Sequence, residues 1–185
     1  MPHSPRLDRR AIVAGAALAA AALAPGAVAQ TPPSTGQLVR CAIFVSDLEV
    51  STRFYRDVVG LPEQLFEGAL DGVPLERLLG LSAGARVRFR ILKAEGPPYG
   101  MIALFQVEGQ TLTRVAKTEG TVNIGEGVLV FYRPDLDALS ARLASIGQTF
   151  LSGPERLVDT PQRRTDREVM LRDPDGVLLN VIERA

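Results

Sequence analysis

The chain has 185 residues, of which 46% are hydrophobic, so it is long enough for one domain with a buried core. Its 21 basic and 21 acidic residues give a formal net charge of zero, which argues against a nucleic-acid partner or attachment to an anionic membrane. Cys41 is the only cysteine, which excludes an intrachain disulfide.

Residues 1–29 predict an export signal. Arg9 and Arg10 precede an alanine-rich apolar run, and the small residues AVA at 27–29 form a cleavage site. The paired arginines, followed by two apolar residues, favour the twin-arginine route, with a general secretion signal or an uncleaved anchor as alternatives. The apolar run is short for a membrane span, so no stable membrane anchor is expected after cleavage. We therefore expect a periplasmic or secreted protein, with residues 30–36 as a flexible leader.

Residues 38–61 predict a strand, a tight turn and a helix. Residues 38–45 are apolar and β-branched, as suits a buried strand. Ser46, followed three residues later by Glu49, is a capping-box pattern that predicts the start of a helix. Gly60 is placed to end that helix, because glycine takes the left-handed conformation at little cost.

Short strands follow the first helix. They are expected at 63–67, 86–92 and 99–107, with an insertion at 68–84 whose residues 73–79 form a short helix over one mouth of the fold. In the strand at 86–92, Arg86, Arg88 and Arg90 alternate with apolar residues, a period of two that indicates one buried face. The polar stretch 109–126 is expected to link two halves of the chain.

The same unit returns in the second half. A strand is expected at 128–132, a helix begins at Pro134-Asp135, and Gly147 ends it. Further strands are expected at 149–151, 167–171 and 177–182, the last two joined by the turn sequence DPDG. Two copies of one unit indicate an internal duplication.

Three segments carry a family resemblance: FVSDLEVSTRFYRDVVGL, VLVFYRPDLDALSARLASIG and MLRDPDGVLLNVIE. Together they resemble the vicinal oxygen chelate superfamily, which includes glyoxalase I, the bleomycin-resistance proteins and the extradiol dioxygenases. The resemblance covers residues 37–185. It implies an α+β fold of two βαβββ modules, residues 37–108 and 127–185, whose strands form a cupped mixed sheet around a cavity.

The resemblance also implies four inward-facing positions that hold a divalent metal in other members. In this chain they are Arg40, Ala103, Val128 and Asn180. Arginine has no lone pair to donate, alanine and valine have no donor atom, and Asn180 offers one neutral oxygen. The only histidine, His3, lies in the export signal. We therefore expect no metal and no other cofactor.

Side-chain alternation predicts the lining of the cup. If Arg40 points inward, the other inward residues follow by parity, and at least one arginine of 86–92 reaches the cup if the apolar side of that strand packs on helices. The predicted ligand-binding residues are Arg40, Phe44, Arg88, Ala103, Phe105, Val128, Tyr132 and Asn180. Such an apolar cavity with a few polar groups is typical of a small-molecule site.

The sequence favours binding of a small anionic or carbonyl-bearing organic molecule against Arg40, without a metal. Bleomycin-resistance proteins commonly dimerise with the cavity shared between chains, so a homodimer is one expectation. The first alternative is a metal-independent lyase or isomerase, in which Arg40 stabilises an oxyanion and Tyr132 moves a proton. The second is a metal-dependent lyase or dioxygenase with a displaced carboxylate site, drawn from Glu63, Glu67 and Glu168. The third is a scaffold whose cup is filled by its own side chains.

Overall fold

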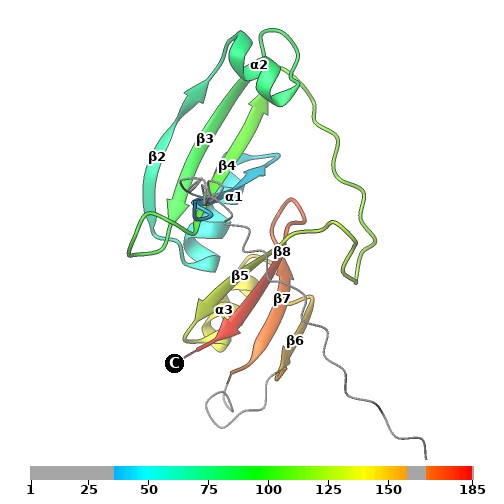
Figure 1. Cartoon of the computed structure of the whole chain (residues 1–185). Helices are drawn as coiled ribbons and strands as arrows, with labels where there is room; N and C mark the ends of the chain where they lie inside the picture. Colours follow the sequence, from blue (N-terminus) through cyan, green and yellow to red (C-terminus); the bar gives the residue numbers. More distant parts are fainter. Residues whose placement is uncertain (1–35, 158–165, 185) are drawn as a thin grey trace, which may run out of the picture. The chain divides into compact units, whose positions relative to one another are not determined.

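The computed structural model describes residues 36–157 and 166–184, and the predicted export signal lies outside these residues (Figure 1). Its strands form two four-stranded mixed sheets, each with one parallel pair and two antiparallel pairs. The predicted α+β fold of two βαβββ modules is confirmed. Within the described residues, no helix has both the length and the apolar character needed to span a membrane.

Sheet A belongs to the first module. Its strands, in spatial order, are β1 (Arg40–Phe44), β4 (Met101–Glu108), β3 (Arg86–Lys93) and β2 (Glu63–Leu70). The short helix α2 (Val73–Leu79) connects β2 to β3 and contains no buried residue. It occupies the range expected from the sequence, and β2 runs three residues further than expected.

Sheet B belongs to the second module. Its strands, in spatial order, are β5 (Val128–Arg133), β8 (Leu178–Glu183), β7 (Glu168–Arg172) and β6 (Ser152–Glu155). Helix α3 (Leu136–Ser145) follows β5, and its N-cap is Asp135, at the predicted helix start. The strand expected at 149–151 is wrong in position, because the pairing with β7 falls on residues 152–155, whose Gly153-Pro154 sequence is typical of a turn rather than of a strand.

The first helix consists of α1 (Leu48–Arg53) and a π-helical segment, η1 (Phe54–Val59). Its cap is Asp47 rather than Ser46: Asp47 Oδ1 accepts the backbone N–H groups of Glu49 and Val50, both at 2.9 Å. Gly60 ends the segment with φ of 97°, the left-handed conformation that was expected there. The helix cap is therefore one residue later than expected, and the buried face of the helix is unchanged.

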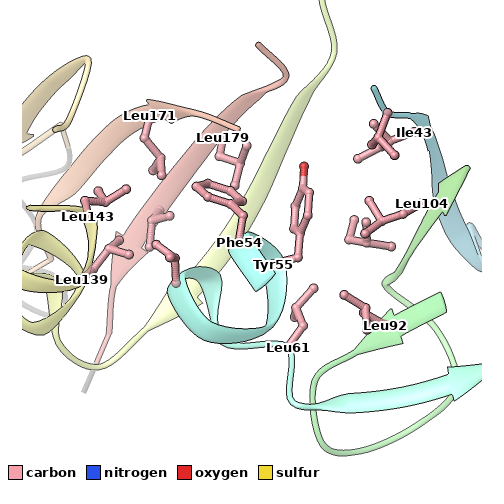
Figure 2. Packing of buried hydrophobic residues seen from close by; sticks show 14 of the residues in the cluster. Ile43, Phe54, Tyr55, Leu61, Leu92, Leu104, Leu139, Leu143, Leu171 and Leu179 are labelled. Carbon is pink, nitrogen blue, oxygen red and sulfur yellow. The ribbon is translucent and has the colours of Figure 1, made fainter. Parts of the chain in front are cut away.

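One hydrophobic core joins the helix-facing sides of both sheets. Figure 2 shows η1 between them. The core residues labelled there come from sheet A (Ile43, Leu92, Leu104), from η1 and its end (Phe54, Tyr55, Leu61) and from α3 and sheet B (Leu139, Leu143, Leu171, Leu179). Because each sheet presents its helix-facing side to this shared core, the opposite side of each sheet points away from it. We call these two surfaces the open face of sheet A and the open face of sheet B.

Candidate ligand-binding site

The open face of sheet A is ordered in three rows across its strands. Strand register places Phe44, Phe105 and Phe89 in one row, Ala42, Ala103 and Ile91 in the next, and Arg40 and Met101 in the third. The parity predicted from Arg40 for β1 and β4 is confirmed, because Cys41 and Ile43 face the shared core while Ala42 and Phe44 are exposed. The predicted residues Arg40, Phe44, Ala103 and Phe105 therefore lie together on one surface.

Three phenylalanine rings line one end of this surface. The ring centroids of Phe44 and Phe105 are 5.8 Å apart, and those of Phe105 and Phe89 are 6.0 Å apart, all in tilted contact. Phe44 is 44% exposed. Beside the rings, Ala42 and Ala103 are neighbours on parallel strands; Ala42 is exposed, whereas Ala103 has no exposed surface. The row with the smallest side chains is thus bounded by aromatic rings on one side and by Arg40 on the other.

Arg40 is exposed and makes no hydrogen bond or ion pair with any residue of the described part of the chain. Within the described residues, Arg40 therefore does not pair with an acid across the sheet. Its guanidinium remains a charged fork with all its N–H donors available to an anion.

The arginines of β3 face the other way, and this corrects the expectation that Arg88 reaches the cup. Ile91, with Phe89 packed beside it, shares a small cluster with Met101 and Ala103 on the open face, so the apolar side of β3 is the open side. Arg88 lies on the helix side, where Arg88 Nη2 is 3.3 Å from Glu49 Oε1. The alternation of arginines with apolar residues correctly predicted a strand with two distinct faces, but it did not predict which face packs on the helices.

Arg90 connects the same helix to the sheet. Its Nη1 lies 3.0 Å from Glu49 Oε2 and 2.9 Å from the hydroxyl of Thr52, and its Nη2 lies 3.0 Å from Glu67 Oε2. The hydrogen bond from Arg90 holds the pKa of Glu49 below its usual value. These charges are satisfied by one another and fasten α1 to sheet A.

The open face of sheet B carries the remaining predicted residues. Val128, Val130 and Tyr132 alternate outward on β5 and are 39%, 56% and 61% exposed. Asn180 follows on β8 beside Val130, and its Nδ2 donates to Glu168 Oε2 at 3.2 Å. The guanidinium of Arg184 lies 4.0 Å from the centroid of the Tyr132 ring, a cation–π contact.

A single chain does not bring all the predicted residues into one cavity. Arg40 and Phe44 lie on the open face of sheet A, whereas Val128, Tyr132 and Asn180 lie on the open face of sheet B, on the opposite side of the shared core. The catalytic pair considered above, Arg40 and Tyr132, is likewise divided.

The residues at the implied metal positions do not fit a divalent ion. They are Arg40 and Ala103 on one sheet and Val128 and Asn180 on the other, and only Asn180 has an oxygen to give. Nor does any group of three His, Cys, Asp or Glu side chains suited to a metal occur among residues 36–157 and 166–184. The carboxylates considered as substitutes are engaged elsewhere: Glu63 with Lys93, Glu67 with Arg90, and Glu168 with Asn180.

A buried polar junction between the modules was not found from the sequence. The hydroxyl of Tyr55, in a side chain with no exposed surface, donates to Asp173 Oδ2 at 2.9 Å. Asp173 Oδ1 accepts the backbone N–H groups of Asp175 and Val177 at 2.9 and 2.7 Å. Burial raises the pKa of Asp173, although these donors oppose the shift. The DPDG sequence predicts the turn but not the bond to Tyr55, because the two residues lie 118 positions apart in the chain.

The second carboxylate of that turn holds the linker. Asp175 Oδ2 accepts the backbone N–H of Ser46 at 2.9 Å, and Asp175 Oδ1 pairs with Arg114 at 3.0 Å. A pocket of about 370 Å³ lies between the linker, the ends of β1 and β4, and this turn. Phe44 is the only predicted site residue in its lining, and the cations of the linker beside it, Arg114 and Lys117, are already paired.

The fold agrees with that of one solved structure, and two further structures match over most of the chain. A glyoxalase family protein from Bacillus cereus is 17% identical with a TM-score of 0.64, covering 84% of this chain and 98% of that one. An antibiotic-binding protein from a Streptomyces species is 21% identical (TM-score 0.46; 83% and 99% covered). A glyoxylase/bleomycin resistance protein/dioxygenase domain from a Frankia species is 20% identical (TM-score 0.49; 82% and 100% covered).

No curated protein matches the chain. The family model of the Glyoxalase/Bleomycin resistance protein/Dioxygenase superfamily matches residues 37–181. The chain therefore belongs to this superfamily, and the resemblance seen in the sequence is confirmed at that level.

Proposed function

We propose that the protein binds a small anionic or carbonyl-bearing organic molecule, without a metal, in a cup formed by two copies of the chain. The open face of sheet A from one copy meets the open face of sheet B from the other. The observation that carries the proposal is the unpaired Arg40 beside an exposed apolar surface. A guanidinium beside a desolvating surface is a strong binding group for a carboxylate, because it offers two parallel donors in a fixed plane.

The second copy is part of the proposal because one chain supplies two half-sites that point apart. Both faces keep large apolar side chains exposed, among them Phe44 and Phe66 on sheet A and Val130 and Tyr132 on sheet B. Neighbouring exposed apolar residues of this size are typical of surfaces that bind a partner. Two-fold pairing of A with B buries both faces at once and yields two equivalent cups.

The charge pattern also supports this pairing. Considering residues 36–157 and 166–184 alone, the open face of sheet A has the unpaired cation Arg40, whereas on the open face of sheet B the carboxylate of Glu168 is bonded only to the neutral amide of Asn180. Opposite charges at the two ends of an apolar interface favour one relative orientation of the copies. Within the described part of its own chain Arg40 has no carboxylate partner, so its N–H donors are available to the bound anion.

The binding function is tested by thermal unfolding with a panel of small carboxylates, aldehydes and their neutral amides. A ligand present at one hundred times its Kd adds about 2.7 kcal/mol to the free energy of unfolding, which raises the melting temperature measurably. We expect shifts with carboxylates or aldehydes that are lost in Arg40→Gln. Arg86→Gln is the matched control and keeps these shifts, because Arg86 is exposed on the same sheet and is not one of the predicted binding residues. The proposal is refuted if no compound raises the melting temperature of the wild type, or if the same compounds raise the melting temperature of Arg40→Gln equally.

We also propose that the chain is exported by the twin-arginine route and matures at residue 30. Support comes from Arg9, Arg10 and the AVA cleavage site in the sequence. An exported binding protein would meet its ligand outside the cytoplasm. Amino-terminal sequencing of the periplasmic or secreted protein tests this, with Gln30 as the expected first residue.

A further inference from the structure

The linker, the ends of β1 and β4, and the DPDG turn enclose a pocket of about 370 Å³ within a single chain, which we call the linker pocket. We propose that it is a second binding site, and that it takes a small uncharged molecule with an apolar body and a hydroxyl or amide group. The proposal goes beyond the anion site, because it needs neither Arg40 nor a second copy of the chain.

The part of the lining that comes from the strands is apolar. It consists of Phe44 and Val45 at the end of β1, Val107 on β4, and Val177 just before β8. Leu112, which is 40% exposed, adds an apolar side chain from the linker. The volume has room for about twelve water molecules at roughly 30 Å³ each, and it falls within the range of small-molecule pockets. An apolar body that displaces this water gains the free energy of burying these side chains.

The charged side chains of the lining are already paired, and this determines the charge of the ligand. Arg114 pairs with Asp175 Oδ1 at 3.0 Å. Lys117 Nζ donates to the carbonyl oxygen of Gly176 at 2.7 Å and pairs with Glu126 at 3.2 Å. A charged ligand would lose its own hydration and compete with these pairs, whereas an uncharged ligand leaves them intact.

The linker supplies hydrogen-bonding groups that carry no charge. Within the part of the chain that the structure describes, no backbone group of residues 111–117 makes a hydrogen bond, and neither do the hydroxyls of Thr111 and Thr113 in the lining. The linker is nevertheless held in place, by the contacts with the DPDG turn and by Gln110 Oε1, which accepts the backbone N–H of Ser82 at 2.7 Å. A hydroxyl or amide of a ligand can bond to these free groups. Apolar walls with a few uncharged polar groups are typical of a site for a neutral molecule.

Three probes that share one aromatic ring test the charge of the ligand: benzyl alcohol, benzoate and benzylammonium. Binding is followed on the full chain by two-dimensional NMR of the backbone amides, which locates each probe on the protein. We expect benzyl alcohol to shift the amide signals of residues 110–117 until they saturate. Its affinity at these residues should be at least tenfold higher than that of either ion.

Two matched variants test the place of binding. Leu112→Glu puts a charge into the lining and should weaken benzyl alcohol at least fivefold. Val122→Glu puts the same charge on a linker residue that is 67% exposed and lies outside the lining, and it should leave the affinity within twofold. Because both residues are exposed, both variants keep the fold, which the amide spectrum verifies.

The outcomes separate this site from the anion site. If benzyl alcohol shifts no signals of the linker, or if the two variants weaken it equally, the linker pocket is not a binding site. If benzoate or benzylammonium binds there as tightly as benzyl alcohol, the uncharged class is overturned. Benzoate that binds through Arg40 is recognised because its shifts disappear in Arg40→Gln, a variant that should leave benzyl alcohol unaffected. Either site can therefore fail while the other stands.

Discussion

Replacing Tyr55 by phenylalanine tests the junction that holds the two modules on one core. The change removes only the hydroxyl, which donates to Asp173 Oδ2 at 2.9 Å and has no access to solvent. A hydrogen bond to a charged group contributes about 1.5–3 kcal/mol, and a buried carboxylate oxygen that loses its donor keeps the cost of its desolvation. We expect the free energy of unfolding to fall by about 1.5–3 kcal/mol, which lowers the urea midpoint by on the order of 1 M.

The pH dependence of this loss distinguishes a hydrogen bond to a carboxylate from a packing defect. Burial raises the pKa of Asp173 above its unfolded value, so this group contributes stability that is fully present below the unfolded pKa and is lost as pH rises through the folded pKa. The Tyr55 hydroxyl opposes that rise, and its removal raises the folded pKa further. The destabilisation of Tyr55→Phe should therefore be larger at neutral pH than in the acid range, where Asp173 is protonated.

The assay is urea unfolding followed by circular dichroism at several pH values. Tyr99→Phe is the matched control, because Tyr99 is 53% exposed and its hydroxyl makes no hydrogen bond with the described residues. It should change stability by less than about 0.5 kcal/mol. A loss below that level in Tyr55→Phe, or a loss equal at every pH, would refute the assigned role of the Tyr55–Asp173 bond.

Three further predictions concern the linker, the pairing of copies and export. Glu126 is held by Arg172 at 2.5 Å and Lys117 at 3.2 Å, and the hydrogen bond from Arg172 lowers its pKa to about 2. The stability that Glu126 contributes is present above its unfolded pKa and is lost as pH falls through its folded pKa. The urea midpoint should therefore fall less between pH 7 and pH 3 in Glu126→Gln than in the wild type. An equal fall in both proteins contradicts this. Light scattering should give the mass of two chains for the wild type and of one chain for Val130→Asp, which puts a charge on the open face of sheet B; a single-chain mass for the wild type contradicts the pairing. Replacing Arg9 and Arg10 by lysines should leave the uncleaved chain in the cytoplasm, as seen by immunoblotting of cell fractions; continued export would point to the general secretion route.

The sequence predicted those parts of the fold that depend on local patterns. Gly60 and Gly147 marked two helix ends, and alternation marked the strands on either side of Arg40. Predicted element boundaries differ from the observed ones where two neighbouring residues could play the same role. Asp47 caps the first helix instead of Ser46, because its carboxylate accepts two backbone N–H groups. The strand β6 was displaced because Gly153-Pro154 has turn composition but still pairs with β7.

The site was predicted less completely, because the missing information is long-range. Period two assigns Arg88 and Phe89 to opposite faces but does not say which face meets a helix; the Glu49–Arg88 and Glu49–Arg90 contacts decide that, across about forty residues. Tyr55 and Asp173 carried no local signal of pairing. The division of Arg40 and Tyr132 between two open faces follows from how both modules share one core, which no motif encodes.

The central claim is that each cup combines sheet A of one copy with sheet B of another. Subunit mixing tests it directly, with Ala42→Trp blocking one face, Val130→Trp blocking the other, and as calorimetric probe the carboxylate or aldehyde that most raises the melting temperature of the wild type. Each variant alone should bind at least tenfold more weakly than the wild type. After subunit exchange, an equal mixture should regain about one quarter of the wild-type sites at wild-type affinity, because half of the randomly paired dimers contain one unblocked cup. A mixture that regains no sites, although its subunits exchange, would contradict the shared cup.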